Sequence, residues 1–398
     1  MEQKYFDLKE IIPALSLIID HQATGNLFHS FRVAIIAYLT SEKAGFWQKD
    51  AVFYEGLLHD IGLFETGEHI LPDYTDIASQ ISNQAILNHP AIGAKIVKEI
   101  PGIPGADSAI LEHHEYFNGS GYPSGKKKKE ILQEAQYLRL ADSFDLFIRK
   151  IPKINHADIV SFAESGSGKE FSPETAFCFL GIDKHVLLSI CQEEGLKSYF
   201  SELSSRIQSP KAVITDDIKE SLLKVLGRAI DGKHRYTNEH SLRVSFYALR
   251  IAKRMGLPKD TCRKIKLAGY LHDIGKIAIP NSILNKPGPL NSEELSTIKT
   301  HAEISYQIVK SVSYFRDFAE LVFASQEEFD GSGYPRSLRG EEIPLGARII
   351  SVADAIDAML SDRAYRKALP RENAVKEITQ KSGSQFDPEV VRTVLKLL

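Results

Sequence analysis

Histidine and aspartate side chains, common protein ligands of transition metals, recur in order along the first half of the chain. They fall at intervals of roughly 25 to 30 residues, which is one ligand set per helix in an up-and-down bundle. Neutral imidazoles and carboxylates suit Fe, Mn, Ni or Zn, and a carboxylate can bridge two ions. The predicted metal ligands are His29, His59, Asp60, His89, His113, His114 and Asp142.

Five histidines and two aspartates exceed what one ion takes from a protein while keeping a position open. We therefore predict two ions about 3.5 to 4 Å apart, with a bridging water acidic enough to be the nucleophile at neutral pH. A lone histidine is more often a hydrogen-bonded surface or core residue, so the prediction depends on the ordered spacing. Five histidines outside that spacing are assigned no metal: His21, His69, His156, His185 and His234.

The same pattern returns in the second half of the chain, offset by 211 residues at His29 and His240 and by 215 residues at Phe171 and Phe386. This period is too long for a solenoid repeat and matches the size of a whole domain. We predict domains over residues 1–205 and 216–398, joined by a linker over residues 206–215.

The second copy is incomplete, because Ser325-Gln326 stand where the first copy has His113-His114. Serine and glutamine do not replace imidazoles as transition-metal ligands. The second copy is predicted to form a degenerate site that holds at most one ion weakly. It retains five of the pattern residues, namely His240, His272, Asp273, His301 and Asp354.

Helical signals dominate both halves. Val244, Ala248 and Ile251 belong to one apolar stripe with helical spacing, which predicts a helix starting near His240. Asn291 and Glu294 resemble a capping box. Ser172-Pro173 and Asp387-Pro388 each place a capping side chain before a proline in the first helical position. We predict an all-α protein of two tandem helical bundles.

Composition narrows the possible environments and partners. The formal charge of −3 gives no electrostatic footprint for polymeric nucleic acid. The three cysteines have neither metal nor disulfide spacing, which fits a reducing compartment. Neither a signal peptide nor an apolar run of membrane-spanning length is evident. We expect a cytoplasmic protein; a homodimer or a signalling partner is left open.

A Gly-Tyr-Pro segment follows the histidine pair, as Gly121, Tyr122 and Pro123, and it is repeated in the second half over residues 333–335. With the His-Asp pairs, it makes the chain resemble a tandem of HD-GYP domains. That branch of the HD phosphohydrolase superfamily hydrolyses cyclic dinucleotides, bacterial second messengers. The resemblance implies a helical bundle with a buried iron or manganese centre that cleaves cyclic di-GMP or cyclic GMP-AMP to a linear dinucleotide with a metal-bridging hydroxide.

By the same resemblance, His29, His59 and Asp142 hold one ion with Asp60. His89, His113 and His114 hold the second ion, also with Asp60. Asp60 is thus the bridging and catalytic carboxylate. Gly121, Tyr122 and Pro123 are expected to contact substrate.

The two halves depart from the family pattern in opposite ways. The lysine expected after the His-Asp pair is present as Lys276 but is replaced by Leu63 in the first half. The family's arginine-rich substrate segment is similar to the stretch from Arg363 to Arg366. The first half offers only Arg149 and Lys150 as nearby substrate contacts, together with Lys153.

Metal ions can stabilise a phosphodiester without cationic side chains, whereas the converse is harder. The first half is therefore the predicted catalytic domain, and the second is structural or regulatory. Two alternatives stay open at this point. One is a non-catalytic module that binds a cyclic dinucleotide or a protein, and the other is a metal-dependent phosphohydrolase for another nucleotide.

Overall fold

The structure is a computed structural model, and it describes residues 8–20, 28–65, 84–100, 102–208, 240–312, 314–361 and 367–397. The chain divides into two compact units, Met1–Lys219 and Glu220–Leu398. Helices build both units, and the ranges just given contain no strand, only two isolated bridges. The predicted all-α class with two tandem helical bundles is confirmed. Most of the predicted linker, from residue 209 onward, lies outside the described residues.

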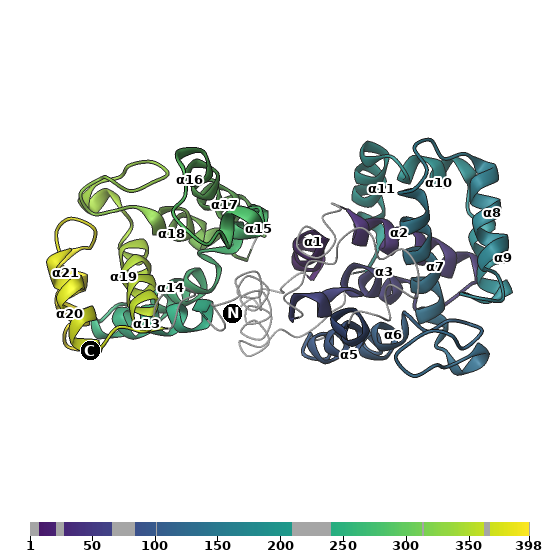
Figure 1. The fold of residues 1–398 in the computed structure, drawn as a ribbon, viewed down its shortest axis with the longest axis horizontal. Helices are drawn as coiled ribbons and strands as arrows, with labels where there is room; N and C mark the ends of the chain where they lie inside the picture. Colours follow the sequence, from purple (N-terminus) through teal and green to yellow (C-terminus); the bar gives the residue numbers. More distant parts are fainter. Residues whose placement is uncertain are drawn as a thin grey trace. The chain divides into compact units, whose positions relative to one another are not determined.

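In the first unit, helix α2 packs against α3 and α7, while α5 packs against η2 and α6 (Figure 1). The central elements are α2 (His29–Lys43), α3 (Lys49–Leu58), η2 (Ile61–Glu65), α5 (Gln84–Lys98), α6 (Ala106–Glu112) and α7 (Gln133–Ile148). The others are α1 (Leu8–Ile19), η3 (Lys128–Glu130), α8 (His156–Gly166), α9 (Pro173–Leu180), α10 (Lys184–Ile190) and α11 (Glu193–Arg206).

The second unit repeats this core, because α13 packs against α14 and α19, and α17 packs against η4. The core elements are α13 (His240–Arg254), α14 (Lys259–Leu271), η4 (Ile274–Ala278), α17 (His301–Ser311), α18 (Ala319–Phe323) and α19 (Leu345–Leu360). The others are α15 (Asn281–Leu284), α16 (Ser292–Lys299), η5 (Arg316–Phe318), η6 (Ala324–Gln326), η7 (Gly340–Glu342), α20 (Arg371–Gln380) and α21 (Pro388–Val394).

Two glycines explain how the ligand-bearing elements approach one another. A Cβ atom added to Gly62 would lie 2.0 Å from the backbone oxygen of His89. Glycine therefore lets η2, just after the His-Asp pair, lie directly against α5. Gly275 repeats this contact in the second unit, where an added Cβ would lie 2.1 Å from the backbone oxygen of His301.

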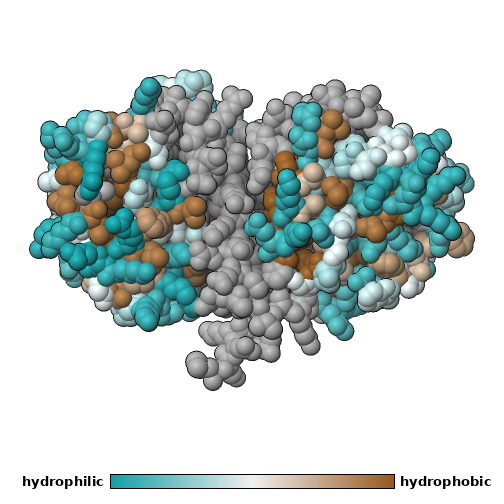
Figure 2. Space-filling view, turned by 90° about the horizontal axis from the view of Figure 1, so that it is seen from below, coloured by the Kyte–Doolittle hydropathy of each residue, from teal (hydrophilic) through white to brown (hydrophobic). Residues whose placement is uncertain are grey.

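The predicted caps are confirmed, and the helix predicted to carry Val244, Ala248 and Ile251 is present as α13. Asn291 and Glu294 form the predicted capping box of α16, and the Ser172 and Asp387 side chains accept backbone N–H bonds at the starts of α9 and α21. Among the described helices, none combines the length and apolar character needed to cross a bilayer. On the face in Figure 2, hydrophilic and hydrophobic residues are interspersed.

Candidate metal centre

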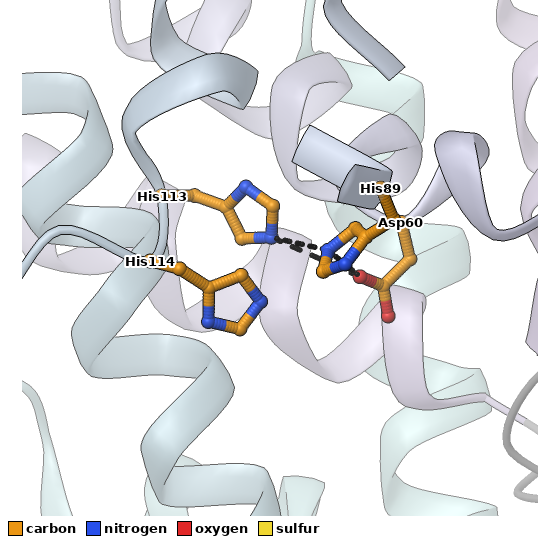
Figure 3. Close-up of side chains that lie close together, drawn as sticks. All are labelled: Asp60, His89, His113 and His114. Atoms are coloured by element: carbon orange, nitrogen blue, oxygen red, sulfur yellow. Dashed lines mark hydrogen bonds and ion pairs between the residues drawn. The ribbon is translucent and has the colours of Figure 1, made fainter. Parts of the chain in front are cut away.

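The seven predicted ligands of the first unit come from five different elements or their ends, and they meet in the interior. His29 starts α2, His59 and Asp60 follow α3, and Asp142 lies in α7. All seven side chains are buried. Their ligand atoms form two groups, each within 4.8 Å: Asp60, His89, His113 and His114 in one, and His29, His59 and Asp142 in the other. Figure 3 shows the first group directed toward a common point.

Three of these histidines donate a hydrogen bond from Nδ1 to a backbone oxygen three residues earlier. His59 donates to Gly56 at 2.8 Å, His89 to Ile86 at 2.7 Å and His113 to Ile110 at 2.6 Å. Carbonyl oxygens near helix ends lack helical partners, and Pro90 has no N–H for the carbonyl of Ile86. Since a carbonyl only accepts, each Nδ1 carries the proton and each Nε2 presents a lone pair to the centre.

The Nε2 atoms face one another in pairs. His29 and His59 are 3.2 Å apart at Nε2, and so are His89 and His113. Two lone pairs at this distance cannot form a hydrogen bond without a proton or another cation between them. Neutral imidazoles fixed in this way are suitable metal ligands, so the residues present fit a metal ion at each pair.

Asp60 lies between the two pairs. Its Oδ2 atom is 3.5 Å from Nε2 of His29 and 3.4 Å from Nε2 of His59. Its Oδ1 atom is 3.3 Å from Nε2 of His89 and 3.8 Å from Nε2 of His113. One carboxylate therefore offers a separate oxygen to each imidazole pair, which is the arrangement that a bridging ligand needs.

The pKa values of the histidines differ between the two pairs, and the His29–His59 pair is the one that favours positive charge. Burial alone would lower the pKa of His29, but the Asp145 and Asp60 carboxylates raise it to about 10. Burial, with a smaller contribution from the neighbouring His89 and His59, lowers the pKa of His113 to about 4 although Asp60 opposes the change. Burial opposes ionisation of Asp60, yet His59 and the other surrounding histidines hold its pKa well below the usual value.

Sequence reasoning missed two buried residues that hold the ligands. Asp145 accepts a hydrogen bond of 2.7 Å from Nδ1 of His29, so it keeps the proton on Nδ1 as the carbonyls do for His59, His89 and His113. Its counterpart Asp357 holds His240 at the same distance, and this repeat of an aspartate three residues after Asp142 and Asp354 was the available signal. Arg139 contacts His114 and Asp142, but no repeated residue marks it.

The predicted substrate contacts lie in different places. The Tyr122 ring stacks on His114, with centroids 4.7 Å apart, and Gly121 passes so close to the His114 backbone that a side chain would clash. Pro123 and Lys150 are exposed. Arg149 forms an ion pair with Asp145 behind His29. Contact of these residues with substrate stays a prediction.

In the second unit, His240, His272 and Asp273 form a buried group able to hold a metal ion. Asp354 lies 3.4 Å from Nε2 of His240, and His301 lies 3.4 Å from Oδ1 of Asp273. Within the described part of this unit, three buried atoms of the group have no hydrogen-bond partner: Nε2 of His272, Nε2 of His301 and Oδ1 of Asp273.

Other groups stand where the first unit has its remaining ligands. Lys276 places Nζ 2.5 Å from Oδ2 of Asp273. Ser325 donates to the backbone oxygen of Val322, and Gln326 accepts from the Tyr334 hydroxyl. Arg363 and Arg366 lie outside the described residues.

An all-helical unit that buries a His-Asp pair among further histidines defines a class of metal-binding domain. Family models described as HD domain match residues 26–146 and 224–390. The chain therefore belongs to the HD domain family, as a tandem of the HD-GYP type.

Several known proteins are similar to this chain. The 3'3'-cGAMP-specific phosphodiesterase 3 of Vibrio cholerae is 30% identical over 77% of this chain and 66% of its own length. A cyclic di-GMP phosphodiesterase of Thermotoga maritima is 41% identical over 46% of this chain and 50% of its own length. The chain thus spans half to two thirds of these relatives.

A crystal structure of a cyclic GMP-AMP-specific phosphodiesterase from V. cholerae shares the fold. Its TM-score is 0.66 at 23% identity, and the match covers 99% of both chains.

Proposed function

We propose that the chain is a metal-dependent phosphodiesterase for cyclic dinucleotides and that the chemistry takes place in the first unit. The observation that carries this proposal is the Asp60 carboxylate, which offers one oxygen to each of two facing imidazole pairs. The names of the relatives, which specify cyclic GMP-AMP or cyclic di-GMP, support the substrate class. The expected product is a linear dinucleotide.

The residues divide into two ligand sets that share Asp60. His29, His59 and Asp142 would hold one ion. His89, His113 and His114 would hold the other. Iron and manganese suit these imidazole and carboxylate donors. When bound, such ions neutralise charge on the phosphodiester and make a water acidic enough to attack phosphorus at neutral pH.

The chain's own residues position this chemistry. Asp145 keeps the Nδ1 proton of His29 in place, so that Nε2 faces the centre. The Tyr122 ring covers one face of His114 and thereby restricts its rotation. At the position of Lys276, the first unit has the buried Leu63, so in our proposal no lysine side chain at this position contributes to neutralising the phosphate.

The second unit acts, in this proposal, as a scaffold or regulator. It lacks the histidine pair, and the Lys276 ammonium lies against Asp273, where the first unit has Leu63 near Asp60. The Lys276 ammonium there neutralises part of the negative charge of Asp273 that a metal ion would otherwise neutralise.

Incubation of the anaerobically metallated chain with cyclic di-GMP and cyclic GMP-AMP, each resolved by chromatography, tests the function. Conversion of either compound to a linear dinucleotide, abolished by a chelator and restored by Fe²⁺ or Mn²⁺, is the expected result. Binding without conversion at full metal content would refute the enzyme and support a non-catalytic binding module. Hydrolysis of other nucleotides alone would refute the substrate class.

A further inference from the structure

Arg139 is the largest fully buried side chain described in the structure, and it lies beside the metal ligands of the first unit. It is on α7, one turn before Asp142, and its Nη1 atom is 3.2 Å from Oδ2 of Asp142. The same Nη1 is 2.7 Å from Nδ1 of His114. The guanidinium also donates to Ser143, which in turn donates to Glu170, and it lies over the Tyr116 ring.

This arrangement exists in one unit and not in the other. At the matching positions, Arg139 becomes Ser351 and His114 becomes Gln326. Of the six residues involved, the aspartate alone is kept. The remaining replacements are Ser143 by Ala355, Glu170 by Gln385 and Tyr116 by Glu328. Arg139 and the groups that hold it therefore occur together with His114 in the first unit, and all of them except the aspartate are missing from the second unit.

The contact with Arg139 sets His114 apart from the other histidines. A guanidinium has donors and no acceptor, so Nδ1 of His114 must accept, and a neutral ring then carries its proton on Nε2. His59, His89 and His113 have the opposite tautomer, with Nδ1 donating to a carbonyl. In the observed arrangement, neither nitrogen of a neutral His114 has a lone pair available for a metal ion.

We propose that Arg139 is a positioning residue that competes with the second metal ion for His114. In the metal-poor protein its charge binds Nδ1 of His114 and the outer oxygen of Asp142. His114 becomes a ligand when Arg139 releases it, so occupancy of the second metal position depends on displacement of the guanidinium. This inference rests on the proposed metal centre and concerns how that centre fills.

Titration of the metal-free chain with Mn²⁺, followed by calorimetry and elemental analysis, tests the competition. Arg139→Met removes a hydrogen-bonded positive charge that opposes a divalent ion. The second ion should therefore bind at least about 10-fold more tightly than it does to the wild type. Ser143→Ala keeps the arginine but removes the hydroxyl that anchors it, and it should shift the affinity in the same direction by less. Both measurements use a His272→Ala background, which removes an ion held by the second unit.

A purely structural role would give the opposite result, because damage to a buried network weakens metal binding. Weaker binding in Arg139→Met, restored by Arg139→Lys, would overturn the proposal and indicate that Arg139 supports His114 as a ligand. Nitrogen-15 NMR of the metal-free chain, assigned with His114→Gln, should find Nε2 of His114 protonated; a proton on Nδ1 would also overturn it. If wild type and variants all bind no Mn²⁺ in the first unit, the proposed centre itself is wrong.

Discussion

The two units have the same helical core, and both contain the first histidine and the His-Asp pair of the ligand set. The groups that surround these residues differ between the units. His59 directly follows α3, and His272 directly follows the matching helix α14. Each histidine donates a hydrogen bond from Nδ1 to a carbonyl of the helix that it follows.

Each unit also places a third histidine, His89 or His301, beside Asp60 or Asp273. The first unit then adds the imidazoles of His113 and His114, whereas the second unit has Lys276 against Asp273 and no histidine at positions 325 and 326. The histidines common to both units are therefore oriented alike, and the two centres differ at Lys276 and at the histidine pair.

The largest difference should follow from removing a ligand shared by both proposed metal positions. Asp60→Ala should lower phosphodiesterase activity by more than about 100-fold, above the loss caused by removing a ligand's hydrogen-bond partner. The matched Asp273→Ala should retain most of the activity. Initial rates at saturating metal, with circular dichroism as a folding control, measure this. Equal losses would mean that both units take part in the chemistry.

A smaller effect is expected from the carboxylates that hold the first histidine of each cluster. Asp145→Asn keeps the shape but weakens the hold on Nδ1 of His29, and metal affinity and activity should fall about 10- to 100-fold. Asp357→Asn makes the same change at His240 and should leave the activity intact. Loss of activity in the second variant would contradict the division between the units.

The loop after the histidine pair offers a third matched test. The buried Glu115 accepts backbone hydrogen bonds from Ser124 and Lys126, and Glu327 does the same for Arg336 and Leu338. Glu115→Gln replaces an acceptor with a donor, so one backbone N–H loses its partner and activity should drop about 10-fold. Steady-state kinetics should find Glu327→Gln silent. If Glu115→Gln is silent too, the loop does not position Tyr122 for the reaction.

The smallest effect concerns stability. Burial, and to a lesser extent nearby Glu134, raises the pKa of Glu55 to about 8. Among the described residues, Oε2 of Glu55 has no hydrogen-bond partner. Because the folded-state pKa lies above the unfolded value, the protonated carboxyl stabilises the unit below about pH 4.5, and this contribution is lost as the pH rises through 8.

Glu55→Gln cannot ionise, so it should raise the melting temperature of the first unit by roughly 5 to 10 °C at pH 8.5, with little change at pH 4.5. Trp47, the single tryptophan, reports this unit in fluorescence melts. The second unit has Ala268 at the matching position, so its transition should not change. A difference independent of pH would show that Glu55 does not titrate on unfolding.

Local signals in the sequence predicted the fold well. The cap at Asn291 and the proline after Ser172 act within a few residues, so a short window contains all the information. The seven predicted ligands meet in the structure, since their regular spacing reflects the helices that carry them. Asp145 was missed because its contact with His29 spans 116 residues, although its repeat as Asp357 was visible. Arg139 has no repeat, and apart from Asp142 and Ser143 on its own helix its partners come from two distant segments, at His114 and Tyr116 and at Glu170.

Hydrogen bonds between histidine Nδ1 atoms and the carbonyls three residues earlier also affect how sequence changes elsewhere in the protein act on the ligands. The position of the proton on each of these rings depends on a carbonyl only three residues away. Substitutions elsewhere in the core therefore leave the Nε2 atom facing the centre. His272 and His301 still have this arrangement although the histidine pair is missing. The second unit thus differs from a full histidine set at positions 325 and 326 alone. Substitutions in two adjacent codons would restore that set.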